Sequence, residues 1–107
     1  MQQDRVCFFY PTKSVGGAQY LFARMAEYLI DNTPYDIILI DYKDGFIRNK
    51  LAGKDYRFIE YRDENIITIQ EPLLLVLPLS FLSLIKKYFV LSKTTRLFFW
   101  DLHPYNL

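Results

Sequence analysis

Apolar residues along the chain gather in short runs that polar residues, glycines and prolines separate. Residues 6–10, 35–42, 73–77 and 96–100 each contain an apolar run that predicts a strand, and the continuous run at 6–10 is typical of a central strand covered on both faces. Residues 18–30 instead carry apolar side chains at three- and four-residue spacing, which predicts an amphipathic helix. The chain therefore opens with the strand, helix and strand of an α/β fold.

Shorter elements fill the rest of the chain. A short helix is predicted over residues 46–52, short strands over 57–61 and 66–69, and a longer helix over 81–91 with Ser80 as its N-cap. Alternating strands and helices with short connections predict parallel pairing and right-handed crossovers. The predicted fold class is α/β, a Rossmann-like three-layer sandwich with a mostly parallel sheet of order 3-2-1-4-5, incomplete at its C-terminal side.

Composition narrows the functional classes. The 107 residues form a single predicted domain, 1–107, with 51% apolar and 18% aromatic residues to fill a core. A net charge of +1 argues against a nucleic-acid partner. The lone Cys7 fits a core position in a reducing compartment. Without a secretory signal pattern, and with an apolar run at 73–85 too short to cross a membrane, we expect a cytoplasmic protein.

The segment that joins the first strand to the first helix is the main candidate for binding. It closes on Gly16 and Gly17, which lack a Cβ and would let a ligand approach the backbone. The N–H groups and dipole of the following helix would favour an anion such as phosphate. Neither G-x-G-x-x-G nor G-K-[ST] is present, so neither a dinucleotide fingerprint nor a P-loop is supported. A tight turn without a ligand remains the alternative.

The only histidine, His103, follows the last predicted strand. An imidazole with a pKa of about 6.5 can donate a hydrogen bond or serve as acid or base, so we interpret His103 as the catalytic candidate. Asp101 would orient it or meet a substrate hydroxyl, or else hold its own loop. Asp31, Asp41 and Asp44 lie at predicted turns and are expected to be solvated. One histidine and one cysteine in distant strands predict no metal site.

Two segments together resemble one enzyme family. Gly16-Gly17-Ala18-Gln19 resembles the G-G-[AV]-[EQ] pattern near the start of family-4-type GT-B glycosyltransferases, and residues 98–104, FFWDLHP, are similar to its apolar strand and W-x-x-H segment. The resemblance implies two facing Rossmann-like domains, with the acceptor mostly on the N-terminal one and the nucleotide sugar mostly on the other. It implies metal-independent hexosyl transfer without a cofactor, to an acceptor such as a glycan or lipid-linked sugar.

The same resemblance assigns roles to individual residues. His103 would match the family's histidine near the transferred sugar, and Gly16 and Gly17 would approach the donor pyrophosphate or the acceptor. Lys13 and Gln19 flank this loop as further candidates for binding. The family's second domain and its E-x7-E motif are missing, so the chain resembles a truncated N-terminal portion that we expect to be inactive alone.

Three further expectations concern partners. The apolar strand at 96–100 would leave a sheet edge exposed, which predicts a homodimer or aggregation. A basic group would either touch anionic lipid at the inner face of the membrane or be a solvated helix end; it comprises Lys86, Lys87, Lys93 and Arg96. The alternative to a transferase is a non-enzymatic, flavodoxin-like α/β binding module. A receiver domain is set aside because Pro11 and Thr12, not acidic residues, follow the first strand.

Overall fold

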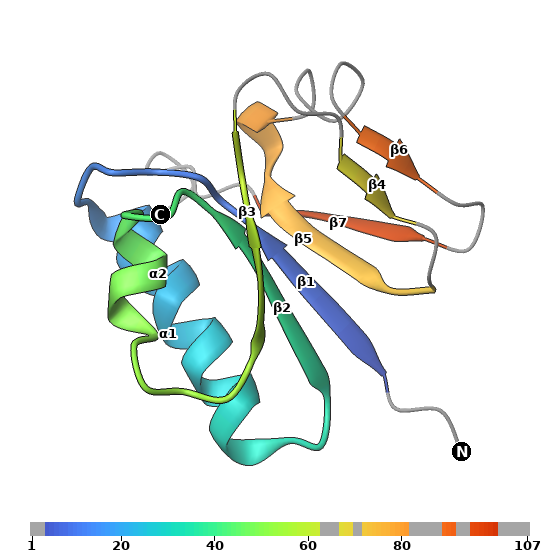
Figure 1. Ribbon diagram of the computed structural model, residues 1–107, viewed down its shortest axis with the longest axis horizontal. Coiled ribbons are helices and arrows are strands. Elements are labelled where there is room, and N and C mark those ends of the chain that lie inside the picture. Colours follow the sequence, from blue (N-terminus) through green and yellow to red (C-terminus); the bar gives the residue numbers. More distant parts are fainter. Residues whose placement is uncertain (1–3, 63–66, 70–71, 82–88, 92–94, 101–107) are drawn as a thin grey trace, which may run out of the picture.

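A parallel five-stranded sheet organises the chain. The computed structural model describes residues 4–62, 67–69, 72–81, 89–91 and 95–100 (Figure 1). Its elements are β1 (Arg5–Phe9), α1 (Gly17–Asn32), β2 (Asp36–Asp41), α2 (Phe46–Lys50), β3 (Arg57–Glu60), β4 (Ile67–Ile69), β5 (Leu74–Pro78), the 3-10 turn η1 (Leu79–Phe81), β6 (Phe89–Leu91) and β7 (Arg96–Trp100).

The sheet has the order β3-β2-β1-β5-β7, and neighbouring strands in it pair in parallel. The predicted α/β class and the order 3-2-1-4-5 are confirmed, with β5 and β7 as the fourth and fifth strands. The central strand β1 places Phe8 between Leu39 of β2 and Val76 of β5. Cys7 lies beside it in the core, as expected from its apolar run. Parallel strands all end at one edge, so the loops that follow β1, β2 and β5 meet there.

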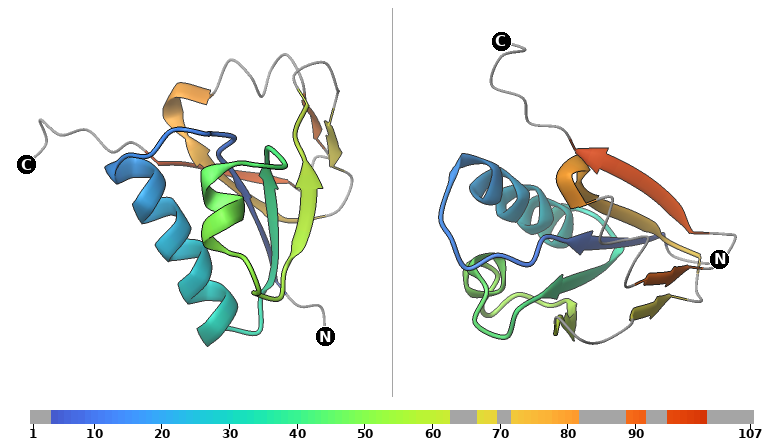
Figure 2. Two further views of the ribbon diagram at one scale, coloured as in Figure 1. Left: turned by 60° about the vertical axis from the view of Figure 1, so that its left-hand side comes forward. Right: turned by 90° about the horizontal axis from the view of Figure 1, so that it is seen from above.

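Both helices cover the same face of the sheet (Figure 2). The helix predicted over residues 18–30 is α1, which buries Phe22, Ala23 and Ala26 against the sheet. The Phe22 ring meets Phe8 of β1 edge to face, with ring centroids 5.6 Å apart. Ile47 of α2 is fully buried in the same cluster. This packing fixes the start of α1 next to the end of β1.

The opposite face is covered differently from the prediction. Phe9 of β1 packs there against Phe89, with ring centroids 4.8 Å apart. Strands β4 and β6 pair in parallel as a separate two-stranded sheet that joins this cluster. The helix predicted over residues 81–91 is therefore wrong at 89–91, which form β6, and Ser80 lies within η1 instead of capping a helix. Residues 82–88 lie outside the described part of the chain.

A physical reason for this difference lies in the residues of β6. Phe89 is buried and Val90 is exposed, so burial alternates as it does along a strand. Aromatic and β-branched residues also favour strands over helices. The backbone of Ile67 in β4 supplies the pairing partner for Phe89. In the part of the chain that the structure describes, no helix combines the length and apolar content that crossing a membrane requires.

Candidate functional site

The loop at residues 11–17, called the glycine loop below, connects the end of β1 to the start of α1. Gly16 is the N-cap residue in an extended conformation, and Gly17 is the first helical residue. The first intrahelical hydrogen bond runs from the Tyr20 N–H to the Gly16 carbonyl at 3.0 Å. Within the described residues no side chain caps α1, and its first turn holds no acidic residue. The N–H groups of the first turn thus have no intrahelical acceptor and no side-chain cap.

Polar side chains fold the glycine loop on itself. The Ser14 N–H donates to Thr12 Oγ1 at 3.2 Å, and the two hydroxyl oxygens lie 3.0 Å apart. The Gln19 side-chain amide donates to Ser14 Oγ at 3.3 Å. Thr12 and Ser14 thereby set the path of the chain, and Gln19 closes it from the helix side.

The two glycines of this loop differ in their surroundings. A Cβ on Gly16 would lie 2.7 Å from Gln19 Oε1, so the space beside Gly16 is taken by that side chain. A Cβ on Gly17 would have no atom of the described residues within 4 Å. Gly17 is therefore the glycine whose backbone a ligand can approach.

Lys13 reaches from the glycine loop to the loop after β2. Its Nζ lies 3.4 Å from Asp44 Oδ1 and 5.3 Å from the centre of the Tyr42 ring. Both members of the ion pair are well exposed, so the pair adds little to stability and Lys13 can exchange Asp44 for another anion. Lys13 thus belongs to the glycine loop but reaches towards the loop after β2, whereas Gln19 contacts the glycine loop at Ser14.

Asp41 corrects one expectation from the sequence. It ends β2 fully buried, although a solvated carboxylate was expected. Backbone N–H groups of Thr12, Tyr42 and Arg48 donate to its oxygens at 3.2, 2.7 and 3.0 Å. Burial raises the pKa of Asp41, while these N–H bonds act in the opposite direction. Its position after four buried strand residues was the signal in the sequence that could have identified it.

The Asp41 carboxylate occupies the start of α2. It accepts the Arg48 N–H of that helix and leaves no room for a Cβ on the N-cap residue Gly45. Asp31 and Asp44, by contrast, lie at the surface, where Asp31 pairs with Lys54 at 2.9 Å. Asp41 therefore acts inside the protein as the anion of the β2–α2 connection.

Two predicted site residues, His103 and Asp101, lie outside the described part of the chain, as do Lys86, Lys87 and Lys93. Their proximity to the glycine loop stays a prediction. Strand β7, which precedes His103, runs parallel to β5, so its carboxyl end lies at the same sheet edge as the glycine loop. Across the described residues, no group of three or more histidine, cysteine or carboxylate side chains could hold a metal ion.

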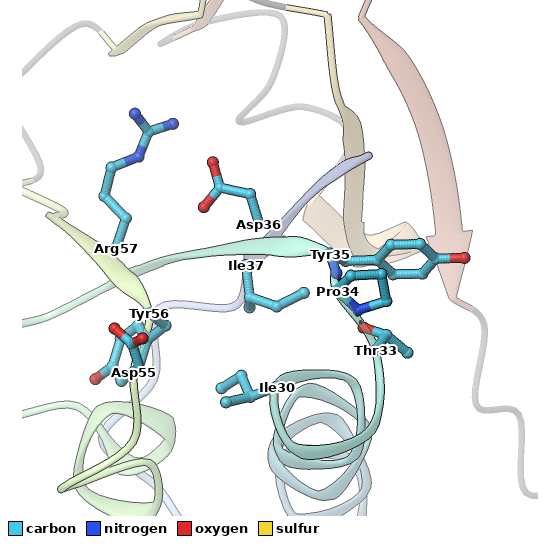
Figure 3. A pocket seen from close by; sticks show the side chains of 9 residues that line it. All are labelled: Ile30, Thr33, Pro34, Tyr35, Asp36, Ile37, Asp55, Tyr56 and Arg57. Atoms are coloured by element: carbon cyan, nitrogen blue, oxygen red, sulfur yellow. Dashed lines mark hydrogen bonds between the residues drawn. The ribbon is translucent and has the colours of Figure 1, made fainter. Parts of the chain in front are cut away.

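A cleft of about 560 Å³ lies at the other edge of the sheet, between the end of α1 and the starts of β2 and β3 (Figure 3). Its lining mixes carboxylates, an arginine and two tyrosines, and Asp36 already pairs with Arg5 at 3.5 Å. Since α1 separates this cleft from the glycine loop by its whole length, the cleft is not part of the candidate site.

Comparison with models of known protein families found no match, and neither curated proteins nor solved structures gave a significant match.

Proposed function

We propose that this chain is the N-terminal, acceptor-side domain of a GT-B glycosyltransferase, in which the glycine loop binds a phosphate of the sugar donor or of a lipid-linked acceptor. The observation that supports this proposal is the uncapped start of α1 at Gly17, beside the carboxyl end of the central strand β1. In doubly wound sheets this edge, near the change of strand order between β1 and β5, is where ligands bind.

Each residue of the candidate site has a separate binding role in this proposal. The N–H groups at the start of α1 would hold a phosphate, helped by the positive end of the helix dipole. Lys13 would add a cation from the loop side, because its present partner Asp44 is exposed. Gln19 would meet a sugar or phosphate oxygen with the amide that now contacts Ser14.

The catalytic part of the proposal follows the family resemblance. Cleavage of a sugar–diphosphate bond leaves negative charge on the leaving phosphate, and fixed backbone dipoles stabilise such charge without a metal ion. His103 would lie near the transferred sugar and Asp101 would orient it. A lipid-linked acceptor would bring the domain to the inner face of the membrane. The isolated chain is expected to bind without catalysing transfer.

Titration by NMR tests the binding step. Uridine diphosphate glucose, guanosine diphosphate mannose and inorganic phosphate are added separately to the isotope-labelled chain. We expect amide shifts that centre on Gly17 and Ala18, with a nucleotide-sugar Kd of about 1 mM, as is reasonable for half of a two-domain site. Phosphate alone is expected to bind at least about tenfold more weakly, because it lacks the sugar and nucleoside contacts.

A matched pair of variants locates the site. Gly17→Val places its Cβ where no described atom lies within 4 Å, apart from its chain neighbours and the backbone of α1, so we expect the fold to be retained and the ligand to be blocked. Ala52→Val makes the same kind of change at an exposed position after α2 and leaves binding unchanged. Equal shifts in both variants, or no shift at the glycine loop with either nucleotide sugar, would contradict the proposal. Equal affinity for phosphate and nucleotide sugars would instead favour the non-enzymatic binding module.

A further inference from the structure

The strand β7 forms one edge of the five-stranded sheet, and its sequence is RLFFW. Leu97 is 40% exposed and Phe98 is 53% exposed, on opposite faces of the strand. Among the described residues no strand pairs with its outer side. Apart from Arg96 at its first position, β7 contains neither charge nor proline, the features that normally protect an edge strand.

The opposite edge of the sheet is protected. Strand β3 begins with Arg57 and ends with Glu60, whose carboxylate pairs with the Arg62 guanidinium at 3.2 Å. Charged residues on an edge oppose pairing with another strand. The apolar edge at β7 is therefore a feature of one side of the sheet only.

The direction of the backbone groups in β7 follows from one hydrogen bond. The Arg96 N–H donates to the Leu73 carbonyl at 2.9 Å, so the polar groups of Arg96 face β5. Along a strand these groups alternate between the two sides. The N–H and carbonyl groups of Leu97 and Phe99 consequently face outward, where a further strand can bind them.

We propose that β7 pairs in an antiparallel manner with β7 of a second copy of this chain, about a two-fold axis at Phe98. This register places Leu97 of each copy opposite Phe99 of the other, so the outward N–H and carbonyl groups of both residues form hydrogen bonds. Phe98 of one copy lies opposite Phe98 of the other in a non-hydrogen-bonded pair, with Cα atoms about 4.5 Å apart and side chains in contact. A two-fold pairing uses the same strand on both copies and closes the assembly at a dimer.

Charge favours the antiparallel direction and does not oppose self-association. The two Arg96 residues lie at opposite ends of the paired strands, about 14 Å apart along them. A parallel arrangement would set the two arginines side by side and is disfavoured. With a net charge of +1 on each chain, long-range repulsion between two copies is small.

Sedimentation velocity over a range of concentrations measures the association. The parent chain is expected to form a dimer, and Phe98→Lys, which sets two like charges opposite each other, is expected to weaken it at least about tenfold. Val90→Lys is the matched control, since Val90 is 55% exposed on β6 in the other sheet, and it retains the dimer. Circular dichroism establishes that both variants are folded.

Cross-linking tests the register without depending on a charge. Phe98→Cys is expected to form a covalent dimer on mild oxidation, since Cα atoms about 4.5 Å apart suit a disulfide. The parent chain, whose Cys7 is buried, and Val90→Cys are expected to give none. A parent chain that stays monomeric at high concentration overturns the proposal, because the edge is then covered by its own chain or suited to another partner. Equal loss of the dimer in Phe98→Lys and Val90→Lys also overturns it.

Discussion

Two neighbouring strand–loop–helix connections in this sheet begin their helices in different ways. In the β2–α2 connection the buried Asp41 carboxylate accepts the Arg48 N–H and occupies the helix start. In the β1–α1 connection no described side chain caps the helix, and the space beside Gly17 is open. The protein therefore caps the start of α2 with its own carboxylate and leaves the start of α1 without a described side-chain cap.

The last residue of each strand accounts for the difference. Strand β2 ends on Asp41, whose short side chain reaches the helix start directly. Strand β1 ends on Phe9 and is followed by Tyr10, whose ring packs against Phe22 and Phe81 at 5.1 and 5.3 Å. Burial raises the pKa of Tyr10, so it stays a neutral packing residue. The stretch from Phe9 to Gly17 thus contains no carboxylate that could cap α1.

Replacement of the buried Asp41 carboxylate should have the largest effect on the unfolding free energy. Asp41→Ala leaves the buried N–H groups of Thr12 and Arg48 without their acceptor, and we expect a loss of about 3 kcal/mol in unfolding free energy. Urea denaturation followed by circular dichroism measures it. Asp44→Ala is the control, because it removes only an exposed ion pair and should change stability by about 0.5 kcal/mol or less. Equal losses in the two variants would show that the Asp41 contacts do not matter.

The glycines at the two helix starts provide the next test. Gly45→Ala forces a methyl group onto the Asp41 carboxylate and should destabilise the protein by about 1–3 kcal/mol. Gly17→Ala adds a methyl group in open space at the start of a helix, where alanine is favoured, and should be neutral or stabilising by up to about 1 kcal/mol. Thermal unfolding of both variants measures these changes in stability. A Gly17→Ala variant that is less stable than Gly45→Ala would contradict the described structure of the two helix starts.

The titration of Asp41 should change the unfolding free energy by a smaller amount, in a direction that its pKa shift defines. Because burial raises the pKa of Asp41 in the folded state, the folded protein holds the proton more tightly than the unfolded chain. Unfolding free energy should therefore fall as pH rises from about 4 through the folded pKa. Asp41→Asn, measured over the same pH range, should lack this component. A parent chain that gains stability relative to Asp41→Asn over that range would refute the assigned direction.

The smallest effect is expected at the open helix start. Gln19→Ala removes an exposed hydrogen bond to Ser14 and should change unfolding free energy by about 0.5 kcal/mol or less. In the nucleotide-sugar titration the same variant should weaken binding several-fold, about 1 kcal/mol, if Gln19 meets the ligand. A change in stability without a change in affinity would assign Gln19 to the loop alone.

Much of the fold was predictable because apolar runs mark buried parallel strands directly. The strand order followed from their alternation with helices, and the helix predicted over residues 81–91 was wrong at its described residues 89–91. Its apolar residues suit either a helix or a strand, and the pairing of Phe89 with Ile67 decides for a strand at 89–91. That pairing joins distant parts of the chain, which periodicity does not report.

The candidate site was predictable only in part, for a similar reason. Glycines after a first strand indicate the loop that begins α1, and Gly16, Gly17 and Gln19 do lie there. The burial of Asp41 depends on the N–H of Thr12, a residue 29 positions away, which no local pattern reveals. A Cβ on Gly45 would collide with this same carboxylate, which again depends on the folded structure. The roles of His103 and Asp101 stay predictions.

Thr12 joins the two connections mechanically. Its N–H is held by Asp41 at 3.2 Å, and its carbonyl accepts the Phe46 N–H at 2.8 Å. Thr12 cannot leave this position without breaking its bonds to Asp41 and to the first residue of α2. Amide hydrogens of Thr12 and Phe46 should therefore exchange with solvent in one shared opening event. A ligand that holds Thr12 in place would then also slow exchange at Phe46, the first residue of α2.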